Sequence, residues 1–172
     1  VVSKGRAAGA PGLSYAIKWQ DDAGDVFKFD IATGGTVKTA TSTTAFAVGS
    51  DWVHIGATYD GAHARIYING KEEGSTAVTG SINYGLTDDA FIIGKLGLGG
   101  SERNFNGLVD DVAIWGVALS ADEISDLWMG NTKSSGTIRP DMVKRADLKA
   151  WWKLDEGTGN TSTDAINSLV AT

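Results

Sequence analysis

The chain contains no cysteine among its 172 residues. Thiolate metal sites, disulfide bonds and thiol nucleophiles are therefore excluded. Proline is also rare, with 2 residues against 23 glycines, which is typical of many tight turns between strands rather than of a disordered linker. No apolar run reaches the length needed to cross a bilayer, so the sequence predicts no transmembrane span.

Basic residues are in the minority. Lysine and arginine number 15 against 21 aspartates and glutamates, which gives a formal net charge of −6. No basic stripe exists that could displace counterions from phosphates, so we predict no nucleic-acid partner. A hydrophobic content of 42% is enough for one well-buried domain. The acidic balance suits a soluble secreted protein or one that binds divalent cations.

The start of the chain shows neither a methionine nor a charged segment followed by an apolar core. No signal peptide is therefore visible, and we expect that the chain is processed or excised from a longer protein.

Alternating apolar and polar residues predict several half-buried β-strands. Asp60-Gly61 lies between the predicted strands 52–59 and 64–69, and Asn69-Gly70 ends the second of them. Both dipeptides supply the positive φ angles of tight hairpin turns. The predicted strands include residues 13–19, 25–31, 52–59, 64–69, 73–79, 90–94 and 108–115. This spacing of short strands predicts an all-β fold in which two antiparallel sheets pack as a β-sandwich.

A single short helix is predicted near residue 120. Ser120 followed by Glu123 is a capping box, and Gly130 is expected to end the helix. The polar residues 133–146 are interpreted as a connection, and a strong strand, LKAWWKL, begins at Leu148. The pattern therefore predicts an all-β sandwich with one short peripheral helix.

Two sequence blocks resemble a known family. Trp52, His54 and the Thr58–Gly61 turn precede Tyr67–Gly70, as in the motif W-H-x-x-x-T-Y-D-G followed by Y-x-N-G. Residues 105–112 with 118–120 resemble its closing motif F-x-G-x-I-D-D-V followed by A-L-S. The chain thus resembles the laminin-G-like jelly rolls of the concanavalin A-like lectin/glucanase superfamily. The resemblance implies an extracellular or cell-surface module for adhesion, carbohydrate recognition or surface structure.

The order of the segments differs from that family. Residues 148–157 resemble the opening of such a domain, yet here they follow its closing strand and helix. We expect residues 1–132 to form the main part of a jelly roll, 133–146 a connection, and 147–172 an opening strand segment that docks in cis or on a neighbouring subunit. The chain is then a piece of a tandem array, a permuted domain, or a self-assembling filament or surface-layer subunit completed by strands of a neighbouring chain.

Glycoside hydrolysis, a reaction of some enzymes of this superfamily, needs two carboxyl groups about 5 to 10 Å apart. Asp110 and Asp111 are strand neighbours and are expected to point to opposite faces. Glu72 and Glu73 stand beside a hairpin turn, where solvation is expected. We therefore predict that the chain is not an enzyme.

Calcium is the predicted cofactor, because hard oxygen ligands bind it and because related sandwiches tie the opening segment to the closing strand with a structural calcium ion. The resemblance implies Asp110, Asp111, Asp155, Glu156 and Asp164 as metal ligands. The alternative is that Asp111 caps a loop and that the other acids only solvate a turn.

Exposed aromatic rings stack on sugars, so three aromatic residues are predicted as ligand contacts: Trp19, Tyr84 and Trp151. Trp52, Trp115 and Trp128 are expected in the core or against the helix. The predicted partners are therefore further copies of the chain and a polysaccharide or glycan.

Overall fold

The computed structural model describes residues 2–5, 12–20, 24–47, 49, 51–84, 90–96, 103–132, 138–159, 161–168 and 170–171. The chain divides into two compact units, Val1–Asn106 and Gly107–Thr172. No helix in the described ranges is long and apolar enough to cross a membrane.

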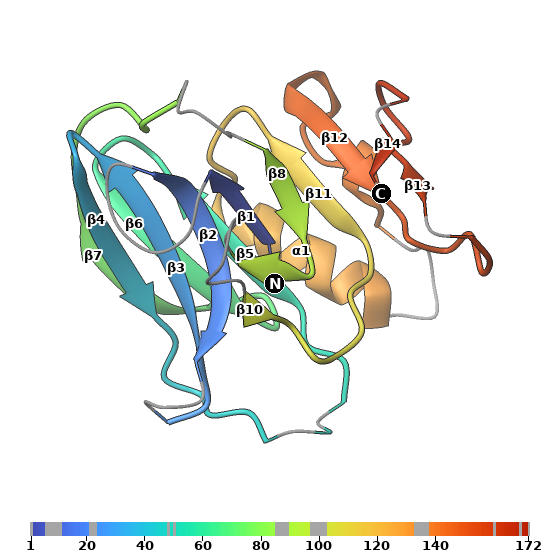
Figure 1. The fold of residues 1–172 in the computed structure, drawn as a ribbon, viewed down its shortest axis with the longest axis horizontal. Helices are drawn as coiled ribbons and strands as arrows, with labels where there is room; N and C mark the ends of the chain where they lie inside the picture. Colours follow the sequence, from blue (N-terminus) through green and yellow to red (C-terminus); the bar gives the residue numbers. More distant parts are fainter. Residues whose placement is uncertain are drawn as a thin grey trace. The chain divides into compact units, whose positions relative to one another are not determined.

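The first unit contains two larger antiparallel sheets (Figure 1). The five-stranded sheet has the order β4-β3-β2-β1-β8, and the three-stranded sheet has the order β5-β6-β7. The strands are β1 (Val2–Gly5), β2 (Leu13–Gln20), β3 (Val26–Thr33), β4 (Thr36–Thr41), β5 (Ile55–Tyr59), β6 (His63–Ile68), β7 (Lys71–Ala77) and β8 (Phe91–Ile93). A short pair, β9 (Lys95–Leu96) and β10 (Arg103–Asn104), completes the unit.

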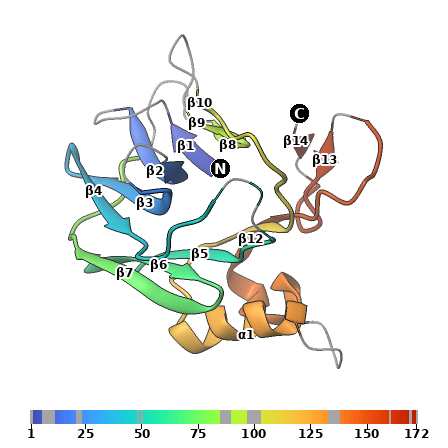
Figure 2. The same cartoon turned by 90° about the horizontal axis from the view of Figure 1, so that it is seen from below.

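The apolar core of this unit lies between the two sheets, which Figure 2 shows as separate layers. Alternate residues of β3 (Phe27, Phe29 and Ile31) point into it, as the period of two requires. From the other sheet, Ala64, Ile66 and Ile68 of β6 meet them. The sequence prediction of an antiparallel β-sandwich is thus confirmed.

The two predicted hairpins, β5–β6 and β6–β7, are present, but the first strand, β5, is shorter than expected. Asn69 and Gly70 both have positive φ, as the turn between β6 and β7 requires. β5 begins at Ile55 and not at Trp52. Before it, the backbone N–H of His54 donates to the Asn69 side-chain oxygen at 3.0 Å. Trp52 is 63% exposed, so its predicted place in the core was wrong.

Glu73 of β7 joins the three-stranded sheet to the segment that follows β4. Its carboxylate accepts the backbone N–H groups of Thr43 and Thr44, at 3.0 and 2.9 Å, and the hydroxyl of Thr44 at 2.5 Å. Burial alone would raise the pKa of Glu73, but these hydrogen bonds outweigh it and hold the pKa below its ordinary value. Glu73 was expected to be solvated beside a turn, but it is half-buried and binds residues 29 and 30 positions away in the sequence.

Replacing Glu73 with glutamine is expected to lower the free energy of unfolding by about 1 kcal/mol at pH 7, since charge-assisted bonds become neutral ones. A depressed carboxyl pKa stabilises the fold above the unfolded-state pKa of about 4.3, and this contribution disappears as the pH falls through the folded-state pKa. The difference between wild type and Glu73→Gln should therefore shrink toward zero between pH 5 and strongly acidic pH in thermal melts. Glu72→Gln, at an exposed neighbour, is the matched control. Equal effects of both substitutions would contradict this role of Glu73.

The second unit is built around a two-stranded sheet (Figure 1). β11 (Val112–Trp115) pairs with β12 (Leu148–Trp152) in antiparallel register, with Val112 opposite Trp152 and Ile114 opposite Ala150. The other elements are α1 (Ala121–Thr132), the 3-10 turns η1 (Pro140–Met142) and η2 (Arg145–Asp147), and the pair β13 (Ser162–Thr163) and β14 (Val170–Ala171). The tryptophan-rich strand thus docks on β11 of the same chain.

Local geometry in this unit confirms one boundary and corrects two. The capping box is present, since Ser120 and Glu123 each accept the other's backbone N–H. Gly130 does not end the helix, which continues to Thr132, and its missing Cβ admits the backbone of Ile138. β11 begins at Val112 because Asp111 has a φ of 49°, which interrupts the predicted strand.

Candidate binding pocket

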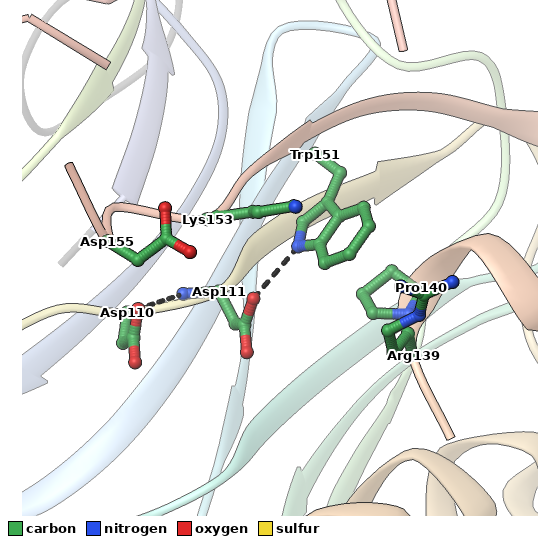
Figure 3. A pocket seen from close by; sticks show the side chains of 7 residues that line it. All are labelled: Asp110, Asp111, Arg139, Pro140, Trp151, Lys153 and Asp155. Carbon is green, nitrogen blue, oxygen red and sulfur yellow. Dashed lines mark hydrogen bonds between the residues drawn. The ribbon is translucent and has the colours of Figure 1, made fainter. Parts of the chain in front are cut away.

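A pocket of about 270 Å³ opens on the second unit beside β11 and β12. Seven residues line it: Asp110, Asp111, Arg139, Pro140, Trp151, Lys153 and Asp155. In the view of Figure 3, the three aspartates lie on one side and Arg139 with Pro140 on the other. The pocket therefore brings carboxylate acceptors and cationic donors to one cavity.

Asp111 joins the strand that precedes the helix to the tryptophan-rich strand. Its carboxylate accepts the indole N–H of Trp151 at 2.9 Å, and its own backbone N–H points to the carbonyl of Lys153 at 3.4 Å. The Lys153 ammonium lies 5.1 Å from the centre of the Trp151 ring, within cation–π range. These contacts fix Trp151 and Lys153 as one wall of the pocket (Figure 3).

Asp164 supports this wall from inside the unit. It is 1% exposed, and its carboxylate accepts three backbone N–H groups. These come from Trp151 at 2.6 Å, Ile166 at 3.0 Å and Asn167 at 2.7 Å. Asp164 thus satisfies buried donors and holds the backbone of Trp151 in place.

Charge in the pocket is unevenly balanced. Asp110 is exposed overall, but partial desolvation of its carboxyl group, followed by repulsion from the Asp111 and Asp155 carboxylates, raises its pKa. Among the residues that the structure describes, no salt bridge involves these three aspartates, whereas Arg139 pairs with Asp141 at 3.2 Å. Asp110 and Asp111 each accept an internal hydrogen bond, from the Asp111 backbone N–H and the Trp151 indole N–H, and a carboxylate has further acceptor sites for a ligand.

Comparison with known proteins agrees with the sandwich and its closing strand. A family model described as "Concanavalin A-like lectin/glucanases superfamily" matches residues 1–125. The chain belongs to this laminin-G-like family. The match includes β11 and the start of α1. It ends before β12, the strand that contains Trp151.

Two curated relatives share part of this laminin-G-like chain. Mouse pappalysin-1 (Mus musculus) is 38% identical over 114 residues, and human pappalysin-1 (Homo sapiens) is 30% identical over 115 residues. Each alignment covers 62% of this chain and 7% of the relative, so the chain spans only a small part of their length. Among solved structures, an S-layer domain-containing protein of Clostridium thermocellum is 30% identical, with a TM-score of 0.38, over 60% of this chain and 52% of the other.

The five predicted metal ligands do not gather at one point. Asp110, Asp111 and Asp155 line the pocket, but Asp164 is occupied by backbone donors. Glu156 accepts the Ser162 hydroxyl at 2.6 Å and the Thr163 N–H at 3.2 Å. No group of three or more histidine, aspartate or glutamate side chains within the described ranges is arranged to hold a metal ion. The arrangement does not fit the five-residue site, and calcium binding stays a prediction.

The three predicted sugar platforms have different environments. Tyr84 is 59% exposed, whereas Trp19 is half-buried and packs against the core of the first unit. Trp151 is 5% exposed, so its predicted role as an open stacking surface was wrong. It contributes to the pocket as a buried wall, held by Asp111 and Asp164.

Sequence reasoning missed three lining residues, Arg139, Pro140 and Lys153. A signal for Lys153 was present, because Trp151, Lys153 and Asp155 follow each other at a spacing of two. The polar connection gave no such signal for Arg139 and Pro140, since their approach to the pocket depends on η1.

Proposed function

We propose that the chain is a non-catalytic, extracellular or cell-surface binding module that holds a carbohydrate in this pocket. The observation that carries the proposal is the lining, in which three carboxylates lie in one cavity with an arginine and a lysine. Sugar hydroxyl groups both donate and accept hydrogen bonds, so they need both kinds of partner. The volume of about 270 Å³ is slightly below the range of about 300–1,000 Å³ for drug-sized ligands, which favours a ligand as small as a single sugar ring.

A binding role accounts for the pocket better than glycoside hydrolysis does. A raised pKa at Asp110 is in the direction that a general acid needs, but the second carboxylate, Asp111, is held by the indole of Trp151. All three pocket aspartates are exposed to solvent, and an active site gains by excluding water. We therefore expect no release of reducing sugar from polysaccharides by the purified chain, and sustained release would overturn the non-catalytic proposal.

Replacing Arg139 with alanine is expected to weaken binding of a carbohydrate identified on a glycan array by about tenfold or more. The loss of a charged hydrogen-bond donor costs about 1.5 kcal/mol or more. The measurement is isothermal titration calorimetry with the selected sugar.

Arg145→Ala is the matched control for this substitution. Arg145 also contacts Asp141, at 3.4 Å, but it does not line the pocket. We expect its variant to bind like the wild type. Equal losses in both variants, or no sugar bound by the wild type with or without calcium, would contradict the proposed function. Sugar binding by the wild type that is lost only when a calcium chelator is added would support the calcium prediction.

A second candidate function is self-assembly at a cell surface. The observation that favours it is that β11, inside the matched family region, receives its partner strand β12 from outside that region. A strand supplied in this way can equally come from another copy.

A further inference from the structure

The second unit consists of two parts that meet along β11. We name residues 107–132, with β11 and α1, the acceptor part, and residues 138–171, with β12, the donor segment. Strand pairing joins them over Val112–Trp115, and the Trp115 indole N–H donates to the Val143 carbonyl at 2.9 Å. Beside this pairing, Lys144 of the donor segment contacts Glu123 of α1 at 3.1 Å. The joint therefore combines backbone, side-chain and charge contacts.

The donor segment also has an internal structure of its own. Asp164 binds the Trp151 N–H, and the Ala165 N–H donates to the Trp151 carbonyl at 2.8 Å. The Asn167 side chain donates to the Lys149 carbonyl at 2.5 Å. Because these bonds do not involve the acceptor part, the segment keeps them when it leaves one acceptor and enters another.

Chain connectivity does not select the partner of β11. β11 and β12 are separated by α1 and two 3-10 turns, not by a tight hairpin. The contacts that hold the donor segment are identical whether it belongs to the same chain or to a second copy. Exchange then changes mainly the entropy of association, which favours the same chain in dilute solution and the second copy at high local concentration.

We propose that copies of this chain exchange the donor segment, so that β12 of one copy pairs with β11 of another. This inference rests on the second candidate function, and it identifies the surface and the partner. Trp151 and Trp152, which are 5% and 6% exposed, are buried by the exchanged contact as they are within one chain. Reciprocal exchange gives a dimer, and one-way exchange gives a growing chain of subunits.

Disulfide trapping between two full-length variants tests the exchange, because the natural chain has no cysteine. Ile114 and Ala150 are opposite each other in the β11–β12 pair, and opposed strand residues lie within disulfide range. An affinity-tagged Ile114→Cys chain is mixed with an untagged Ala150→Cys chain, unfolded, refolded together at high concentration and oxidised. We expect a tagged–untagged disulfide dimer at a yield at least about tenfold above that of a mismatched pair.

The mismatched pair is Val112→Cys with Ala150→Cys, because Val112 is opposite Trp152. The double variant Ile114→Cys/Ala150→Cys in one chain should form an internal disulfide, which shows that the positions fold and are within reach. If it does, and the mixed chains link no better than the mismatched pair, the exchange is overturned. Light scattering of the wild type then separates exchange of the donor segment from self-assembly in general. Oligomers that form no disulfide link mean assembly through another surface. Monomers at all concentrations overturn self-assembly as well.

Discussion

Replacing Asp164 with alanine is expected to lower the free energy of unfolding of the second unit by about 3–5 kcal/mol. Three backbone N–H groups lose a charged acceptor, and each such bond contributes about 1.5–3 kcal/mol, although losses at one side chain do not add fully. The site is 1% exposed, so water replaces the carboxylate poorly. Because typical domains are stable by only about 5–15 kcal/mol, we expect a large fall in the denaturant midpoint.

The pocket should fail together with stability in this variant, because Asp164 holds the backbone of Trp151. Near-ultraviolet circular dichroism and tryptophan fluorescence report the loss of the fixed indole. Asp164→Asn keeps one acceptor oxygen for Trp151 and Ile166 and places an amide N–H group against Asn167, so an intermediate loss is expected. Asp155→Ala, at an exposed pocket residue, should change stability by no more than about 0.5 kcal/mol. An Asp164→Ala variant as stable as Asp155→Ala would show that other groups satisfy these N–H donors.

Asp164 also shows where sequence reasoning reaches its limit. Its carboxylate was assigned to a metal by resemblance, yet its shortest hydrogen bond, at 2.6 Å, is to the N–H of Trp151, 13 residues away. The sequence gives no indication of which acid in a polar turn becomes buried. By contrast, the alternation in β3, the Asn69-Gly70 turn and the Ser120 capping box were predicted correctly, because each depends on residues close together in the chain.

The tryptophans also show that local patterns are predictable from the sequence whereas tertiary contacts are not. Trp52 lies in the family motif and was expected in the core, but it is exposed because β5 begins only after His54 is tied to Asn69. Trp151 was expected to face solvent, but its strand pairs with β11 and its ring is covered by Lys153. Alternation along a strand identifies two faces, and only the tertiary partners decide which face is buried.

Among substitutions in the first unit, Gly74→Ala is expected to have the largest effect on the free energy of unfolding. Gly74 is in β7, and a Cβ at this position would overlap with the backbone carbonyl of Thr41 at the end of β4. Backbone cannot rotate away as a side chain can, so the strands must separate where Glu73 joins them. We expect a loss of about 3 kcal/mol in the free energy of unfolding, measured by urea denaturation.

Ser75→Ala is the neighbouring control, since Ser75 is exposed on the same strand and its change should stay within about 0.5 kcal/mol. The double variant Glu73→Gln/Gly74→Ala extends the argument. If Gly74→Ala separates the strands, the bonds from Glu73 to Thr43 and Thr44 are already weakened, so the second substitution adds less than its effect alone. Full additivity, or a stable Gly74→Ala variant, would mean that β4 and β7 adjust without separating and that the close approach at Thr41 does not hold the sandwich together.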